Sequence, residues 1–123
     1  MFRRAIAPPT AEQQARQDAA RELGCIACRQ WKNYPMMKTQ CGPSEIHHQT
    51  RSGSGRQIGQ DETVCLGSWH HRAICLPGYT ASQMEAEFGP SLARGSKPFY
   101  RVFGTNYEQL QFQNELIERW HGK

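Results

Sequence analysis

The sequence predicts a small α+β domain, in which helices at both ends enclose a central strand–loop–strand–helix segment. Capping-box spacings mark helices in both outer parts of the chain, whereas the middle shows no helical period. With 123 residues, 37% of them hydrophobic, the chain has room for one core. We therefore expect a single domain, with an N-terminal helical extension at 1–24, a core at 25–78 and a C-terminal helical region at 79–123.

The first helix is predicted over residues 11–23. Thr10 and Gln13 have the spacing of a capping box, and the run AEQQARQDAAREL is rich in helix formers until Gly24 can end it. Residues 25–46 lack periodicity and predict a Cys-bearing turn followed by short strands. The polar, glycine-rich run RSGSGRQIGQ, residues 51–60, predicts a loop.

The second half of the chain supplies another strand and several helices. The run ETVCLGSW predicts a short strand, and Ser68 can cap a following helix that includes Ile74 and ends before Pro77. The capping-box spacing recurs twice downstream and predicts helices near 81–88 and 106–121. Between these two, the aromatic residues of GPSLARGSKPFYRVFG predict one more short helix.

The cysteines indicate a metal site. Their number, five, is odd, and the chain begins without an apolar export signal, so metal ligation is favoured over a disulfide framework. Cys25 and Cys28 have the CxxC spacing with which a tight turn presents two sulfurs to one tetrahedral zinc. We expect one structural Zn²⁺, with Cys41 as third ligand and His70 as fourth, Cys65 being the rival for the fourth position.

Four of the five histidines occur as two adjacent pairs. His47 and His48 end the first expected strand, where an extended backbone sends neighbouring side chains to opposite sides. His70 and His71 fall on the expected helix, where neighbouring rings diverge by about 100 degrees. Each pair can therefore serve two separate sites.

The order CIAC, EIHH, a Gly/Arg-rich loop and TVCLGSWHHR resembles the ββα-metal, or HNH, nucleases. More narrowly, EIHH, the RQIG loop, LGSWHHR and FGPSLARGSKPFYRVFG resemble the phage Ref family of RecA-dependent nucleases. The likeness to the nuclease core covers about residues 25–76, and the Ref-like segment extends it to about residue 105. The resemblance implies a ββα-metal core that is stabilised by the structural zinc and flanked by the terminal helices.

The resemblance also implies catalytic roles. It makes His47 and His71 ligands of a catalytic divalent cation, Mg²⁺ or Zn²⁺, and His48 the general base, with Arg72 near the scissile phosphate. A neutral imidazole can take a proton from water near pH 7, and a cation can neutralise the charge that develops on the leaving 3′ oxygen.

Two departures from the family pattern bear on the ligands. Glu62 stands where the HNH name expects Asn, and Cys75 stands where some relatives have a further histidine ligand, so either residue is a candidate third ligand of the catalytic cation. In many relatives a second CxxC opens the helix, whereas here those positions are Gly67 and His70. Because the second CxxC is absent, we assign Cys41 as a ligand of the structural zinc.

The charge distribution is consistent with a polyanionic partner. The formal net charge is +4, and the first 60 residues hold nine basic and four acidic side chains. Four basic residues in glycine-containing segments are expected to contact DNA phosphates without reading the bases: Arg51, Arg56, Arg94 and Lys97.

The narrower resemblance implies that a RecA filament on single-stranded DNA presents the target, and that the chain comes from a phage or prophage. Because the sequence begins without an apolar export signal, we expect the protein to act in the bacterial cytoplasm. No apolar run approaches the roughly 20 residues of a membrane span, and a monomer is favoured. Two alternatives from other classes remain. A zinc-stapled nucleic-acid or protein-binding module would have no use for His48, and a redox protein would need a reactive Cys25 thiolate.

Overall fold

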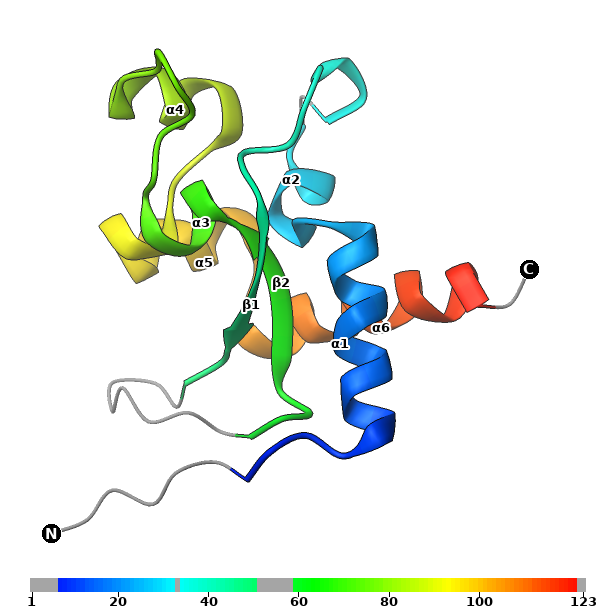
Figure 1. Cartoon of the computed structure of the whole chain (residues 1–123). Helices are drawn as coiled ribbons and strands as arrows, with labels where there is room; N and C mark the ends of the chain where they lie inside the picture. The colour runs from blue at the N-terminus through cyan, green and yellow to red at the C-terminus, as the bar shows by residue number, and fades with distance from the viewer. Residues whose placement is uncertain (1–6, 33, 51–58, 122–123) are drawn as a thin grey trace, which may run out of the picture.

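The computed structural model describes residues 7–32, 34–50 and 59–121, and it has the predicted α+β composition. At its centre, β1 (Ser44–His48) and β2 (Thr63–Gly67) form a two-stranded antiparallel sheet. Figure 1 shows α1 standing beside β2, α6 crossing behind the sheet, and α4 and α5 on the side away from α1. None of the helices in the described part of the chain is long and apolar enough to cross a membrane. The α-helices are α1 (Ala11–Leu23), α2 (Ile26–Gln30), α3 (Ser68–Arg72), α4 (Ala81–Phe88), α5 (Ser96–Phe103) and α6 (Asn106–His121).

The prediction for α1 is confirmed at both ends. The hydroxyl of Thr10 accepts a hydrogen bond from the backbone N–H of Gln13 at 3.1 Å, and the Gln13 side chain accepts one from the backbone of Thr10 at 2.9 Å. Gly24 ends the helix with a φ of 85°, a left-handed value that favours glycine.

The predicted helices of the C-terminal region are also confirmed. Thr80 and Thr105 each form a reciprocal capping box, and they open α4 and α6 respectively. The aromatic segment between them forms α5, which follows a short 3₁₀ helix, η2, at Leu92–Arg94. Helix α5 buries Phe99 and Phe103.

The prediction of short strands between residues 25 and 46 is wrong for most of that segment. Helix α2 follows Cys25 directly, and a 3₁₀ helix, η1, occupies Tyr34–Met36. The sulfur of Cys25 accepts a hydrogen bond from the backbone N–H of Cys28, so a thiol takes the place of the usual Ser, Thr, Asp or Asn cap. Among the described residues of this segment, a strand forms only at its end, where β1 begins at Ser44.

The helix after β2 is shorter than predicted. Ser68 is its first residue rather than its cap, and it ends at Arg72, so Ile74 lies outside it. Ala73 ends the helix in the left-handed conformation, with φ 59° and ψ 35°, and its N–H bonds back to the carbonyls of Ser68 and Trp69. This turn reverses the chain before Pro77 is reached.

Strand β2 separates two hydrophobic clusters. Val64 and Leu66 point into the larger one, which includes Trp69 and the phenylalanines of α4 and α5. Cys65 points into the smaller one, between residues of α1 and α6. All five residues of β2 are buried, whereas the first residue of β1 is exposed and the other four, which include both histidines, are half-buried.

A buried glutamine supports the edge of β2 that β1 leaves unpaired. The side-chain oxygen of Gln113, on α6, accepts a hydrogen bond from the backbone N–H of Cys65 at 2.7 Å. Its amide nitrogen donates to the carbonyl of Thr63 at 2.8 Å. One side chain thus provides the donor and the acceptor that a third strand would offer.

Candidate metal centre and histidine site

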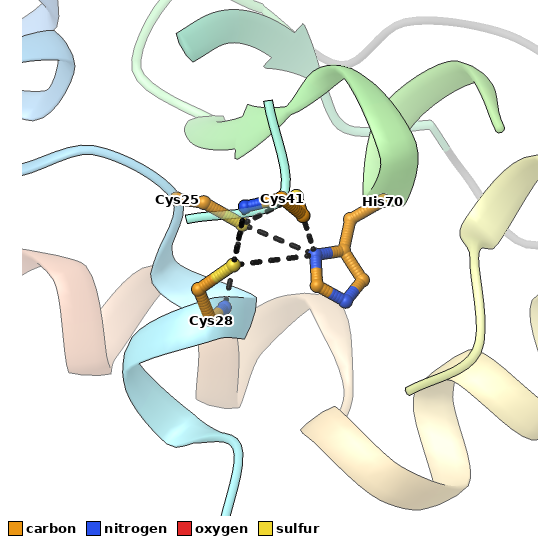
Figure 2. A group of neighbouring side chains, drawn as sticks. All are labelled: Cys25, Cys28, Cys41 and His70. Carbon is orange, nitrogen blue, oxygen red and sulfur yellow. Dashed lines mark hydrogen bonds between the residues drawn. The ribbon is translucent and has the colours of Figure 1, made fainter. Parts of the chain in front are cut away.

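Three cysteines and one histidine converge in the core. Their ligand atoms all lie within 4.8 Å of one another, and all four residues are buried. Figure 2 shows the three sulfurs and the His70 ring pointing toward a common centre. Within the described residues this is the one set of three or more potential metal-ligating side chains gathered so closely. We call it the Cys–His group: Cys25, Cys28, Cys41 and His70.

The distances within the Cys–His group suit a tetrahedral zinc. His70 Nδ1 lies 3.3 Å from the sulfur of Cys25, 3.8 Å from that of Cys28 and 3.1 Å from that of Cys41. The sulfurs of Cys41 and Cys25 are 3.9 Å apart. Zn–S bonds of about 2.3 Å and a Zn–N bond of about 2.0 Å imply ligand separations of about 3.5 to 3.8 Å. The group therefore has the spacing as well as the donor set of a structural zinc site.

The tautomer of His70 also fits a metal ligand. Its Nε2 lies 2.8 Å from the backbone carbonyl of Phe88. Because a carbonyl oxygen only accepts, Nε2 carries the hydrogen, and the neutral ring presents the lone pair of Nδ1 to the three sulfurs. A backbone partner of this kind commonly orients a metal-binding histidine.

The thiols favour a cation between them. Complete burial raises the pKa of Cys25 well above its ordinary value, and the nearby Cys28 and Cys41 raise it further. Hydrogen bonds from those two neighbouring thiols lower the pKa of Cys41. Three thiolates this close together repel one another, and the positive charge of a divalent ion offsets that repulsion so that all three can ionise together.

The position of Cys41 explains how the Cys–His group forms without a second CxxC. A Cβ at position 67 would overlap the sulfur of Cys41, so Cys41 fills the space where a side chain at Gly67 would project. Cys65, the rival ligand, is outside the group. It points to the other face of β2, among residues of α1 and α6.

A second arrangement of histidines lies where β1 meets α3. The rings of His47 and His71 are 5.0 Å apart and meet edge to face. Glu45 Oε1 lies 2.7 Å from His71 Nδ1. Since a carboxylate only accepts, His71 donates from Nδ1, and in the neutral ring the lone pair is then on Nε2. The same carboxylate forms an ion pair with Arg72, whose Nε donates at 2.9 Å.

The surroundings of His47 and Glu45 shift the pKa values of both residues. Burial lowers the pKa of His47 to about 4, and the nearby His71 and His48 contribute to the shift. The hydrogen bond from Arg72 is the main cause of the lowered pKa of Glu45. Near neutral pH, His47 is therefore uncharged and Glu45 is ionised, the forms in which each residue accepts rather than repels positive charge.

His48 points away from His47 and His71, as the alternation of side chains along a strand predicts. Its Nε2 lies 3.0 Å from the side-chain oxygen of Gln60, in the segment that leads into β2. His47, His48 and His71 together form what we call the histidine site. Sequence reasoning missed Gln60 as a hydrogen-bond partner of His48, because only the pairing of β1 with β2 brings Gln60 and His48 together.

The other predicted site residues fall into three classes. Glu62 and Cys75 are half-buried, and within the described residues neither forms a close group with His47 and His71. Arg94 and Lys97 are exposed. Arg51 and Arg56 lie outside the described residues.

Comparison with known proteins gives one match. Searches of curated proteins and of solved structures return no significant similarity. The family model described as recombination enhancement, RecA-dependent nuclease matches residues 9–118, nearly the whole chain. This span runs from the cap of α1 into α6 and includes the Cys–His group and the histidine site. The chain belongs to the family of recombination-enhancement, RecA-dependent nucleases, enzymes that hydrolyse phosphodiester bonds.

Proposed function

We propose that this nuclease hydrolyses DNA with His48 as the general base and with His47 and His71 as ligands of a catalytic divalent cation, Mg²⁺ or Zn²⁺. The observation that carries the proposal is the divergence of the adjacent histidines of β1. His47 meets the ring of His71 at 5.0 Å, whereas His48 contacts Gln60. Two chemically distinct roles for neighbouring residues follow from this divergence.

The order β1, β2, α3 supports a ββα-metal core. In this core His47 comes from the first strand and His71 from the helix. When bound, the cation supplies positive charge that offsets the charge developing on the leaving 3′ oxygen. Glu45 orients His71 by accepting its Nδ1 hydrogen, so the lone pair of Nε2 is available to the cation.

His48 and Arg72 act on the substrate in this proposal. Neutral His48 removes a proton from the attacking water, which needs no covalent intermediate. The guanidinium of Arg72 lies beside His71, and 57% of its side chain is exposed. It can therefore donate to the scissile phosphate while Glu45 holds it in place.

The Cys–His group has a structural part in the proposal. A zinc held by all four ligands is closed to substrate, because every protein ligand of a tetrahedral site is then used. The adjacent residues His70 and His71 belong to different sites, since the first faces the sulfurs and the second faces Glu45. The zinc thus fixes the helix that carries a catalytic ligand.

DNA presented by a RecA filament on single-stranded DNA is the substrate that family membership supports. Arg94 is exposed on η2, which packs against α3, and Lys97 is exposed at the start of α5. In this proposal both contact DNA phosphates, and the sequence adds Arg51 and Arg56, which lie between β1 and β2 in the chain and outside the described residues.

The proposal is tested by three substitutions in a cleavage assay on DNA paired with a RecA filament. His48→Ala should keep cation and DNA affinity but lose about 10² to 10⁴-fold in rate, the usual worth of a general base. His47→Ala and His71→Ala should instead require more cation for half-maximal cleavage. Zinc content serves as the folding control for each variant. Normal cleavage by His48→Ala together with normal cation dependence of His47→Ala would refute the assignment.

Phosphate contact is tested separately through salt. Replacing Arg94 or Lys97 with Gln should weaken DNA binding equally for different sequences, and should reduce the slope of log affinity against log salt by about one. Lys38, exposed in the segment after η1, gives a matched control as Lys38→Gln. A slope identical to that of the unmodified protein would remove the residue from the interface.

A further inference from the structure

A relay of polar side chains connects α1 to His48. The amide of Gln17, on α1, donates to Gln60 twice, to its side-chain oxygen at 3.0 Å and to its backbone carbonyl at 3.3 Å. The Gln60 side-chain oxygen also lies 3.0 Å from His48 Nε2. The amide nitrogen of Gln60 donates to the backbone carbonyl of Ala7 at 2.8 Å.

These contacts determine which way the amide of Gln60 faces. The carbonyl of Ala7 only accepts, so the amide nitrogen of Gln60 must point toward it and its oxygen toward His48 and Gln17. The Gln60 oxygen in turn only accepts, so His48 must carry its hydrogen on Nε2. In the neutral ring, the lone pair is then on Nδ1, on the opposite side of the imidazole from Gln60.

The relay is anchored in the fold. Gln17 is 5% exposed, so its amide depends on these contacts for its hydrogen bonds. Gln13, one turn earlier on α1, donates to Asp61 at 3.1 Å and gives the same segment a second tether. Helix α1 therefore holds the residues that immediately precede β2 at two adjacent positions.

We propose that Gln60 is a positioning residue for the general base, and that Gln17 acts through it. The inference rests on the proposed role of His48. Gln60 fixes the ring orientation of His48 and keeps the hydrogen on Nε2, so that Nδ1 is the nitrogen that receives the proton from water. Gln17 keeps the Gln60 oxygen aimed at His48. The N-terminal helix is thereby part of the catalytic apparatus, although none of its residues contacts the substrate.

The test replaces each glutamine with methionine, which has a similar length but no amide. Single-turnover cleavage of DNA paired with a RecA filament should slow about 10- to 100-fold in Gln60→Met, because misorientation of a reacting group costs rate. Gln17→Met should slow cleavage in the same direction by less. The cation and DNA concentrations for half-maximal cleavage should not change in either variant. Gln14→Met is the matched control, since Gln14 is exposed on the same helix, and it should cleave at the unmodified rate.

Two further measurements separate positioning from general destabilisation. The double variant Gln17→Met/Gln60→Met should cleave no more slowly than Gln60→Met, because Gln17 acts only through Gln60. The ¹⁵N shifts of the His48 ring should report hydrogen on Nε2 in the unmodified protein and a tautomer mixture in Gln60→Met.

The outcomes distinguish this inference from the proposed function. Cleavage by Gln60→Met and Gln17→Met at the unmodified rate, with His48→Ala inactive, would overturn the positioning role and leave the general base in place. Normal cleavage by His48→Ala would overturn the general-base assignment and this inference with it. Rate losses that add fully in the double variant would show that Gln17 does not act through Gln60.

Discussion

Each of the two His-His pairs divides its rings between different neighbours, and local geometry is the reason. On β1, successive side chains alternate, so His47 meets His71 while His48 meets Gln60. On α3, successive side chains diverge by about 100 degrees, so His70 faces the sulfurs while His71 faces Glu45. Adjacent histidines thereby contact different neighbours, although they come from the same element.

The lowered pKa of His47 yields a prediction about pH. Burial places its folded-state pKa at about 4, whereas an unperturbed histidine titrates near about 6.5. Between these values the unfolded chain binds more protons, so the contribution of His47 to stability is complete above about pH 6.5 and is lost as pH falls toward 4. An NMR titration of its ring C2–H signal, without added catalytic cation, should have its midpoint near 4. The same signal in urea should titrate near 6.5, and a folded-state midpoint there would contradict the prediction.

Glu45 should control cation binding through His71. Glu45→Gln keeps the size of the side chain but removes the charge that holds His71 Nδ1 and Arg72. Loss of such an orienting carboxylate typically costs about 10- to 100-fold in metal affinity or activity. Cation titration of cleavage should therefore require a higher concentration for half-maximal rate. Glu85→Gln, at an exposed position of α4, should leave the titration unchanged, and an unchanged curve for Glu45→Gln would exclude the role.

The residues that sequence reasoning identified were those with distinctive types and spacings. The CxxC pair and the choice of Cys41 and His70 are confirmed as one buried group. Gln17, Gln60 and Gln113 were missed, because a glutamine has no diagnostic spacing and their contacts join segments that are far apart in the sequence, such as α1 with the segment before β2 and α6 with β2. Such partners depend on the packing of α1 and α6 against the sheet.

At the scale of elements, local caps were predictable and short elements were not. The Thr-led capping boxes located three helices correctly because their hydrogen bonds are made within four residues. Helix α2 was missed because its cap is the sulfur of Cys25 and its length is five residues. Helix α3 was predicted too long, because Ala73 ends it in the left-handed conformation. Alanine is a strong helix former, so the local sequence does not indicate a helix end there.

The support of β2 by α6 gives a prediction at the same scale. Gln113→Leu removes the hydrogen bonds to Cys65 and Thr63 and leaves a buried N–H and a buried carbonyl without that partner. Each unsatisfied buried group costs about 1 to 3 kcal/mol, so with two such groups the free energy of unfolding should fall by about 2 to 6 kcal/mol. Chemical denaturation measures this change. Gln111→Leu, exposed on the same helix, is the control, and an equal effect of both substitutions would show that the paired hydrogen bonds are unimportant.

At the scale of the whole molecule, the Cys–His group joins segments that a small sheet cannot join alone. It links the start of α2, the segment before β1 and helix α3, and His70 continues the connection to α4 through the carbonyl of Phe88. The larger hydrophobic cluster surrounds this junction. A two-stranded sheet is marginal by itself, so a metal bound by this group would contribute to stability and would also determine where α3 lies.

Removal of zinc should therefore unfold the protein and inactivate the histidine site together. The purified protein should hold about one tightly bound zinc per chain, measured by elemental analysis. Cys28→Ser should lose it and lower the thermal unfolding midpoint strongly, because the binding free energy of a structural zinc is about as large as the whole stability of a small domain.

The control is Cys75→Ser, whose sulfur lies outside the Cys–His group, and which should retain zinc and stability. A strong chelator should reproduce the effect of Cys28→Ser in the unmodified protein. Cleavage should disappear with the zinc even when Mg²⁺ is in excess, because α3 carries both His70 and His71 and the second loses its position when the first loses its metal. A zinc-free preparation with an unchanged unfolding midpoint and full cleavage in Mg²⁺ would show that the cluster is four buried side chains rather than a metal site.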